Sequence, residues 1–291
     1  MDDVLAGQGC AWVFEADALR IRPEGAKVPK LVSELGERVI PHAAIAEVTV
    51  AAGKRGTVVL RVVPRRGADP VMSAAAGQLK EAADPYRLVL PAGRETLAEY
   101  YADELRAAIG ESGPVTRFMV EAPSVPRSFK GWDGAATFDG EAITFTWFWS
   151  GASTAKYSAG DQRFSVSDLE GVEWHAPEGA SGCLRLRVRG GRPDPDPNKD
   201  PASVVFGLGW GATHKSLPFA AAVLASIPAP AVSAPTAPAP AVPAPAVPEV
   251  RRAPSGAEVA ELIAKLGDLR DAGLLSEEEF QAKKAELLSR M

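Results

Sequence analysis

The decapeptide WVFEADALRI at residues 12–21 is matched, in register, by ATFDGEAITF at residues 136–145. In both segments apolar residues alternate with polar ones on either side of a short acidic stretch. Alternation of this kind is typical of β-strands, and a short polar stretch between two such strands is typical of a hairpin turn. The two segments therefore predict the same β-hairpin at two places in the chain.

The similarity continues toward the C-terminus. The segment RVIPHAAIAEV at residues 38–48 matches RFSVSDLEGVE at residues 163–173. In both halves a turn, an apolar strand, a polar insertion, another strand and a closing helix then follow in the same order. An order of elements kept over about 100 residues indicates tandem domains produced by duplication. We expect the apolar strands at residues 57–63 and 183–188, the last strands at 86–90 and 203–208, and the closing helices at 94–109 and 215–227.

The closing helix of the first half carries apolar residues three or four positions apart, so that one face of it must be buried. Covering the preceding antiparallel sheet would turn a curved sheet into a capped barrel. Strands followed by one C-terminal helix, with the pattern Ile-Pro-x-x-x-Ile-x-x-Val at residues 40–48, resemble the bacterial pleckstrin-homology-like (PH-like) domains. The resemblance implies a mainly β fold with some α (α+β): two tandem PH-like barrels, residues 4–111 and 114–227, each closed by a helix.

Residues 228–254 alternate proline with alanine and valine. Such a stretch lacks the backbone donors and the large apolar side chains of a folded core, and it favours an extended polyproline II conformation. We interpret it as a semi-rigid spacer with a reach of up to roughly 80 Å. A docking segment for a proline-reading partner is the alternative.

Residues 255–291 show the punctuation of a helical hairpin. Ser255 with Glu258, and Ser276 with Glu279, are typical of helix N-termini, and Gly273 is typical of a helix end. The string IAKLGDLRDAGLLSEEEFQAKKAELL at 263–288 resembles the short C-terminal (SHOCT) domain. That resemblance implies oligomerisation or attachment to other modules, often beside PH-like domains.

A unit of fewer than about 40 residues without cysteines or metal ligands cannot bury an apolar stripe by itself. We therefore predict that this hairpin associates with itself or docks on a partner. The residues expected to form the assembly surface are its large apolar ones, Leu262, Leu266, Leu269, Phe280, Leu287 and Leu288.

Length, charge and cysteine content argue against several classes of protein. The 291 residues allow about two domains. With 32 basic and 37 acidic residues the net charge is −5, which argues against an electrostatic nucleic-acid binder. Two cysteines exclude a disulfide scaffold, and the acidic start Met1-Asp2-Asp3 and the absence of a long uncharged apolar run predict a cytoplasmic protein.

No recognised catalytic pattern is present. His42 in a predicted strand, His175 at a strand end and His214 at a helix start have no nucleophile motif around them. The segment 194–200 alternates oxygen ligands, but it lacks the glycine and the glutamate of a calcium loop. We predict no enzyme activity, no catalytic residues, no metal and no cofactor.

Two features of the second half suggest contact surfaces. Strict alternation from Cys183 places Arg185, Arg187 and Arg189 on one outer face. This row either binds phosphates or carboxylates, or is a solvated face balanced by glutamates on the neighbouring strand.

The aromatic run at residues 145–149 cannot bury both of its faces in a one-sided sheet. Trp147 and Trp149 either pack against the first half or the insertion, or contact a partner or ligand.

The combined prediction is a non-enzymatic bacterial adaptor or scaffold. It would assemble as a homo-oligomer, or dock, through its C-terminal hairpin, and bind a protein partner through its tandem domains. One alternative is binding of an anionic ligand or lipid surface by the second domain. A weaker one is nucleic-acid binding by residues 228–291, which carry seven basic and nine acidic groups.

Overall fold

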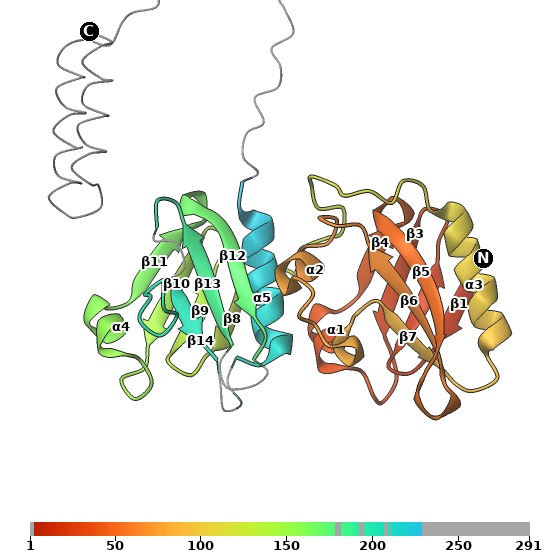
Figure 1. Cartoon of the computed structure of the whole chain (residues 1–291), viewed down its shortest axis with the longest axis horizontal. Coiled ribbons are helices and arrows are strands. Elements are labelled where there is room, and N and C mark those ends of the chain that lie inside the picture. The colour runs from red at the N-terminus through yellow and green to blue at the C-terminus, as the bar shows by residue number, and fades with distance from the viewer. Residues whose placement is uncertain (1–2, 178–181, 192–194, 207–208, 210, 229–291) are drawn as a thin grey trace, which may run out of the picture. The chain divides into compact units, whose positions relative to one another are not determined.

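The computed structural model describes residues 3–177, 182–191, 195–206, 209 and 211–228 (Figure 1). Residues Met1–Val232 form one compact unit, which contains both halves of the predicted duplication. The α+β class is confirmed, because antiparallel sheets are combined with a few helices. The spacer and the C-terminal hairpin lie outside the described residues.

The first half, hereafter the first repeat, contains two antiparallel sheets and a C-terminal helix (Figure 1). The four-stranded sheet consists of β1 (Asp3–Ala6), β2 (Cys10–Phe14), β3 (Ala18–Pro23) and β4 (Arg38–Pro41). The three-stranded sheet consists of β5 (Ile45–Ala52), β6 (Val58–Pro64) and β7 (Arg87–Leu90). Its helices are α1 (Lys30–Leu35), α2 (Pro70–Ala75) and α3 (Glu95–Ala108).

The second half, hereafter the second repeat, has the same plan. Its four-stranded sheet consists of β8 (Arg127–Lys130), β9 (Gly134–Phe138), β10 (Ala142–Trp147) and β11 (Gln162–Ser165). Its three-stranded sheet consists of β12 (Leu169–His175), β13 (Cys183–Val188) and β14 (Ser203–Val205). Its helices are α4 (Thr154–Ala159) and α5 (Thr213–Ser226).

Strand register shows the duplication residue by residue. Trp12 pairs with Ile21 across β2 and β3, and the positions 124 residues later, Ala136 and Phe145, pair across β9 and β10. The same shift relates β5–β6 to β12–β13. It becomes 116 for the last strand, since Leu88 corresponds to Val204, so the insertion before that strand is eight residues shorter in the second repeat.

The predicted match of residues 38–48 with 163–173 was wrong by one position. Leu19 pairs with Ile40, and Ile143 pairs with Phe164, which gives the same shift of 124 as the rest of the sheet. The predicted match aligned Arg38 with Arg163 because the residues are identical, whereas the strand register aligns Arg38 with Gln162. His42 is also not in a strand: it begins a 3₁₀ turn, His42–Ala44, whose counterpart is Val166–Asp168.

The prediction of closed barrels was wrong as well, because the two sheets of each repeat are open. The 3₁₀ turns divert the chain from the first sheet to the second, so β4 and β5 do not continue one ladder. At the other edge, a backbone bond from Gln8 N to Val89 O (2.8 Å) joins the sheets in the first repeat. The bond from Trp132 N to Val205 O (2.7 Å) is its counterpart in the second.

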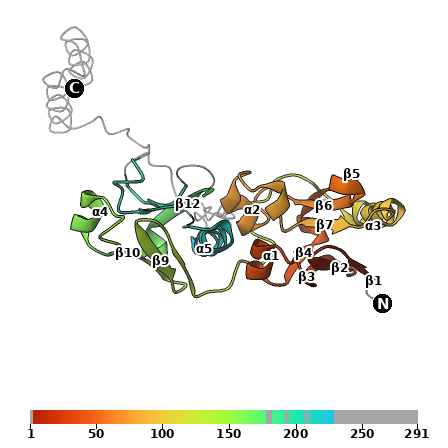
Figure 2. The same ribbon diagram turned by 90° about the horizontal axis from the view of Figure 1, so that it is seen from below.

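The closing helices lie in different surroundings (Figure 1 and Figure 2). Helix α3 buries one face, with Ala98, Tyr101, Ala102 and Leu105 spaced three or four residues apart. Helix α5 is buried at eight consecutive positions, from Ser216 to Val223. It packs on its own sheets, and α1 and α2 of the first repeat cover its other side. The residues of the first repeat that join the core of the second are Leu31, Val71, Ala74 and Ala75.

Candidate binding surfaces

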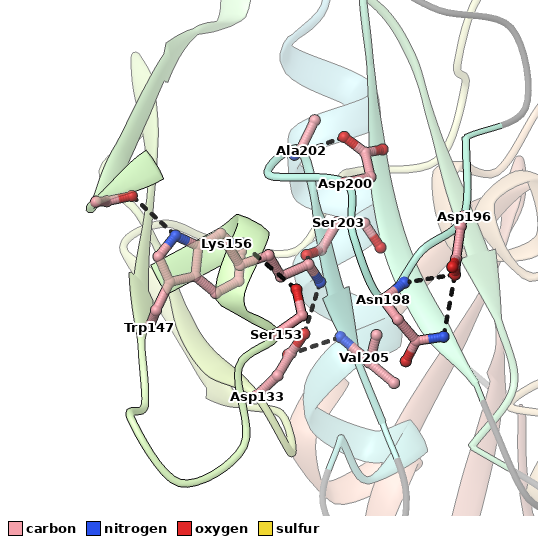
Figure 3. A network of polar contacts seen from close by, with 11 residues as sticks. Asp133, Trp147, Ser153, Lys156, Asp196, Asn198, Asp200, Ala202, Ser203 and Val205 are labelled. Carbon is pink, nitrogen blue, oxygen red and sulfur yellow. Dashed lines mark hydrogen bonds and ion pairs between the residues drawn. The ribbon is translucent and has the colours of Figure 1, made fainter. Parts of the chain in front are cut away.

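A buried ion pair organises one end of the second repeat (Figure 3). Lys156, in α4, donates from Nζ to Asp133 Oδ2 (2.6 Å) and to the carbonyl oxygen of Ser203 (2.7 Å). The other carboxylate oxygen of Asp133 accepts a bond from Val205 N (2.9 Å). The pair therefore ties α4, the loop before β9 and strand β14 together.

The Lys156 side chain is fully buried, with Nζ 5.0 Å from the centre of the Trp147 ring. Burial lowers the pKa of Lys156, and the charge of Asp133 and its hydrogen bond oppose this effect. Removing either partner would leave an unpaired buried charge, which is strongly unfavourable. This arrangement gives the pair an anchoring role, because Lys156 has no access to solvent.

The first repeat has a different buried cluster. Arg38 Nη2 lies 3.1 Å from Asp69 Oδ2, and the Tyr86 hydroxyl donates to the same carboxylate oxygen. Asp69 also caps α2 by accepting a bond from Val71 N (2.6 Å). Burial, followed by the charge of Asp69, raises the pKa of Tyr86, so the phenol stays protonated. Sequence reasoning missed both clusters, because each is assembled from single residues far apart in the chain.

The arginine row lies on the outer face of β13, while Leu184 and Leu186 are buried, as the alternation predicts. Arg185 donates from Nε to Glu173 Oε2 on the neighbouring strand (2.9 Å). Arg187 is 54% exposed with Nη1 3.9 Å from Glu173 Oε1, and Arg189 is exposed beyond the strand end.

A groove on this face carries both signs of charge. Among the residues that the structure describes, its charged lining residues are Glu170, Glu173, Arg185, Arg187, Asp196, Lys199 and Asp200. Four carboxylates and three cations do not form a purely cationic surface, so the observation favours the cross-strand balance over the anion site.

The two tryptophans of the aromatic run are separated by the structure. Trp147 is buried in the core of its own repeat and donates from Nε1 to the Gly160 carbonyl (2.9 Å). It is therefore not available as a contact surface, because β10 places it with Phe145 on the inward face. Strand β10 ends there, and Trp149, in the following turn, is 83% exposed.

Two further aromatic residues are exposed near this turn: Trp132 at 43% and Tyr157 at 59%. Each is the chain neighbour of one member of the buried ion pair, Asp133 or Lys156. The turn itself lies against Trp132, because Gly151 has no room for a Cβ atom beside the Trp132 carbonyl oxygen. We call Trp132, Trp149 and Tyr157 the aromatic surface. The buried ion pair holds the segments of Trp132 and Tyr157 together, and a backbone bond from Phe148 N to Asp133 O (2.9 Å) holds the turn before Trp149 against them.

The histidines lie in separate places. Partial burial, followed by the charges of Lys215 and Lys30, lowers the pKa of His214, so its imidazole is neutral at pH 7. Burial also lowers the pKa of His42, which precedes β5, and His175 ends β12. Among the described residues, no group of three His, Cys, Asp or Glu side chains could hold a metal ion.

Polar bridges fasten the two repeats to each other. Gln78 donates from Nε2 to the Trp174 carbonyl (2.8 Å) and accepts from Ala176 N (3.1 Å). Glu34 of α1 pairs with Arg127 Nη1 (3.1 Å) and Lys215 Nζ (2.5 Å) of the second repeat. Sequence reasoning missed this seam. The sequence feature that could have predicted this contact is the near absence of charged residues in α5, which is typical of a helix buried on all sides.

A comparison with family models identifies both parts of the chain. The model described as Domain of unknown function (DUF4429) matches residues 12–106 and 136–224, which together are more than half of the 291 residues. The chain belongs to the DUF4429 family. A second model, Short C-terminal domain, matches residues 261–288 of this DUF4429 protein, so the predicted duplication and the SHOCT resemblance are confirmed.

No match was found among the curated proteins. The helices in the described part of the DUF4429 chain are all too short or too polar to cross a membrane.

Proposed function

We propose that this DUF4429 protein is a non-enzymatic adaptor that assembles through its SHOCT domain and binds a protein partner through its second repeat. We assign both repeats to the PH-like class, because four strands, three strands and a C-terminal helix follow one another in each. A cytoplasmic location agrees with Cys10 and Cys183, which are both buried and unpaired.

The main support for this proposal comes from the surface by which the first repeat packs on the second. The second repeat does not carry an equivalent surface of its own. Leu31 and Leu35 of α1 pack on the core of the second repeat, and their counterparts in α4, Ala155 and Ala159, are small and exposed. The described part of the second insertion contains no counterpart of α2. A second copy of the chain therefore cannot continue the array by packing its first repeat on this second repeat. We expect self-assembly to use the C-terminal module instead.

The aromatic surface supports a protein partner. Exposed Trp and Tyr side chains combine large apolar area with few rotatable bonds, and they are enriched where proteins bind one another. The mixed charge of the groove on β13 gives less support to an anionic surface as the main target.

The assembly role is tested by the native mass of the full chain and of Leu266→Asp/Leu287→Asp. We expect the full chain to be a multiple of the 30.5 kDa monomer and the double variant to be a monomer. Glu278→Ala, a polar position of the same module, is the matched control and should keep the full-chain mass. A full chain that is already monomeric would reject self-assembly.

A further inference from the structure

We propose that strand β11 of the second repeat is an edge at which two copies of this chain pair. β11 is the last strand of its four-stranded sheet and has only β10 beside it in the described part of the chain. Figure 1 shows it on the side of the second repeat opposite α5. The surface is therefore separate from the contact that joins the two repeats.

The register of β10 and β11 decides which main-chain groups of β11 point outward. Val166 N donates to Glu141 O (2.9 Å), so Phe164, two positions earlier in this antiparallel ladder, also bonds to β10. The N–H groups of Arg163 and Ser165 and the C=O of Arg163 therefore point away from β10. Both residues are exposed, and no backbone bond to these groups occurs among the described residues.

Several other sheet edges are closed. Gln78 occupies the outer edge of β12, and Gly211 N donates to Lys130 O on the outer edge of β8 (2.9 Å). On β4, the counterpart of β11, Pro41 stands at the position of Ser165 and has no N–H to donate. An edge that lacks such protection is a template for pairing with another chain. β11 is open where its counterpart is blocked.

A second copy of β11 is the occupant, because the strand is complementary to itself in one antiparallel register. Pairing Arg163 with Arg163 of the second copy would place like charges opposite each other, which is destabilising. Pairing Arg163 with Ser165 of the second copy avoids this. The N–H of each Ser165 then donates to the C=O of the other chain's Arg163. The ion pair of Arg163 with Asp139 (3.6 Å) is exposed, so it is no obstacle to this arrangement.

The same register brings Phe164 of the two copies together on the two-fold axis. Phe164 is partly buried, and its ring centre lies 5.6 Å from that of Phe145 in the core of the second repeat. At the new edge it belongs to a non-hydrogen-bonded pair, in which side chains approach most closely. Cross-strand aromatic pairs stabilise a sheet. Each ring therefore covers the side of the other that a single copy leaves in solvent.

A contact of this size does not hold two chains by itself. β11 has four residues, whereas stable interfaces bury about 1,200 Å² or more in total. Chains gathered by the C-terminal module meet at a high effective concentration, at which a weak contact forms. The β11 contact therefore rests on the self-assembly proposed above and adds a second interface to it.

Ser165→Pro tests the edge with little change to the fold. Ser165 has a φ of −76°, which proline adopts, and Pro41 occupies the equivalent place in the first repeat with a φ of −58°. The substitution removes the N–H that the pairing requires. Ser165→Ala keeps that N–H and is the matched control.

Disulfide cross-linking of Phe164→Cys in the full chain, under oxidised glutathione, reports the two-fold contact. The natural cysteines, Cys10 and Cys183, are both buried. We expect a covalent dimer to form about tenfold faster than from Lys54→Cys, an exposed position in the first repeat. Adding Ser165→Pro should reduce the rate to that of Lys54→Cys, and adding Ser165→Ala should leave it unchanged.

If Phe164→Cys does not fold, deuterium exchange of the Ser165 amide in the unmodified chain takes its place. The amide should be protected in the assembled chain and exposed in Leu266→Asp/Leu287→Asp. Protection that appears only when a different protein binds would assign the edge to that protein and overturn the proposal.

Native mass keeps this test apart from the test of self-assembly. Ser165→Pro should keep the mass of the full chain, because the C-terminal module is unchanged. An oligomer in which Phe164→Cys cross-links no faster than Lys54→Cys would overturn the β11 contact alone. A monomeric full chain that still forms the covalent dimer at raised concentration would support the β11 contact without the C-terminal module. A monomeric chain that does not form it would overturn both.

Discussion

The two repeats share one strand register and differ in what covers the closing helix. Helix α3 keeps an outer face with Glu99, Tyr100 and Asp103 in solvent, whereas α5 is covered on both sides. The same structural position therefore requires an amphipathic sequence at one end of the array and an almost uncharged one in its middle. The location of a helix in the array, more than its place in the repeat, determines its composition.

The buried polar clusters also differ between equivalent positions of the two repeats. Under the shift of 124, Lys156 corresponds to Val32 and Asp133 to Gly9, so the first repeat has a buried valine and a glycine where the second has an ion pair. Arg38 of the first repeat corresponds in turn to Gln162. The same strand arrangement accommodates a buried charged residue or an uncharged one at a given position. A buried charge requires that its oppositely charged partner is also present.

The ion pair gives the largest expected difference between the repeats. Lys156→Met leaves Asp133 buried without its cation, and we expect the free energy of unfolding to fall by about 3–5 kcal/mol. Urea denaturation followed by far-UV circular dichroism measures the change.

Two variants separate charge from packing at this site. Val32→Met, the equivalent substitution in the first repeat, enlarges a buried apolar side chain without leaving a charge unpaired, and should cost about 1–3 kcal/mol. Asp133→Asn combined with Lys156→Met should recover part of the loss, because no unpaired charge remains. Equal losses for Lys156→Met and Val32→Met would show that the charge is unimportant.

The seam gives the next effect. Leu31→Ala removes an apolar side chain that belongs to the core of the second repeat, and we expect a loss of about 2–4 kcal/mol. The equivalent change in the second repeat is Ala155→Leu, which adds a side chain at an exposed position and should alter stability by less than about 0.5 kcal/mol. Both are measured by thermal and urea unfolding. A loss below 1 kcal/mol for Leu31→Ala would indicate a weakly packed seam.

The periodicity of apolar residues in the sequence, together with the repeated order of elements, was sufficient to predict the hairpins and the closing helices of the two repeats. Alternation identified the hairpins at residues 12–21 and 136–145, and their counterparts pair as the pattern predicts. Helical spacing for the first closing helix, and the repeated order of elements for the second, placed both within two residues of α3 and α5. These features depend on neighbours in the chain, and a single sequence records them directly.

The candidate sites depend on contacts between distant residues, and the sequence alone does not record those. The partner of Lys156 is 23 residues away, and Gln78 meets Trp174 at a separation of 96. Closure of the barrels failed for the same reason, because it depends on pairing between the first and last strands of a repeat. Trp147 was misjudged because burial at a strand end depends on where the strand stops.

The smallest effect concerns the pH dependence of the seam. Although partial burial raises the pKa of Glu34, the bond with Lys215 and the charges of Lys215 and Arg127 lower it below its usual value. A carboxyl group with a lowered pKa in the folded state stabilises the fold above its unfolded pKa of about 4.3, and it loses that contribution as the pH falls through its folded pKa. We expect Glu34→Gln to cost about 0.5–1 kcal/mol at pH 7 and almost nothing near pH 2. Glu37→Gln, whose ion pair with Arg20 lies within the first repeat, is the control for the seam. A cost of Glu34→Gln that stays constant from pH 7 to pH 2 would show that its carboxylate does not hold the repeats together.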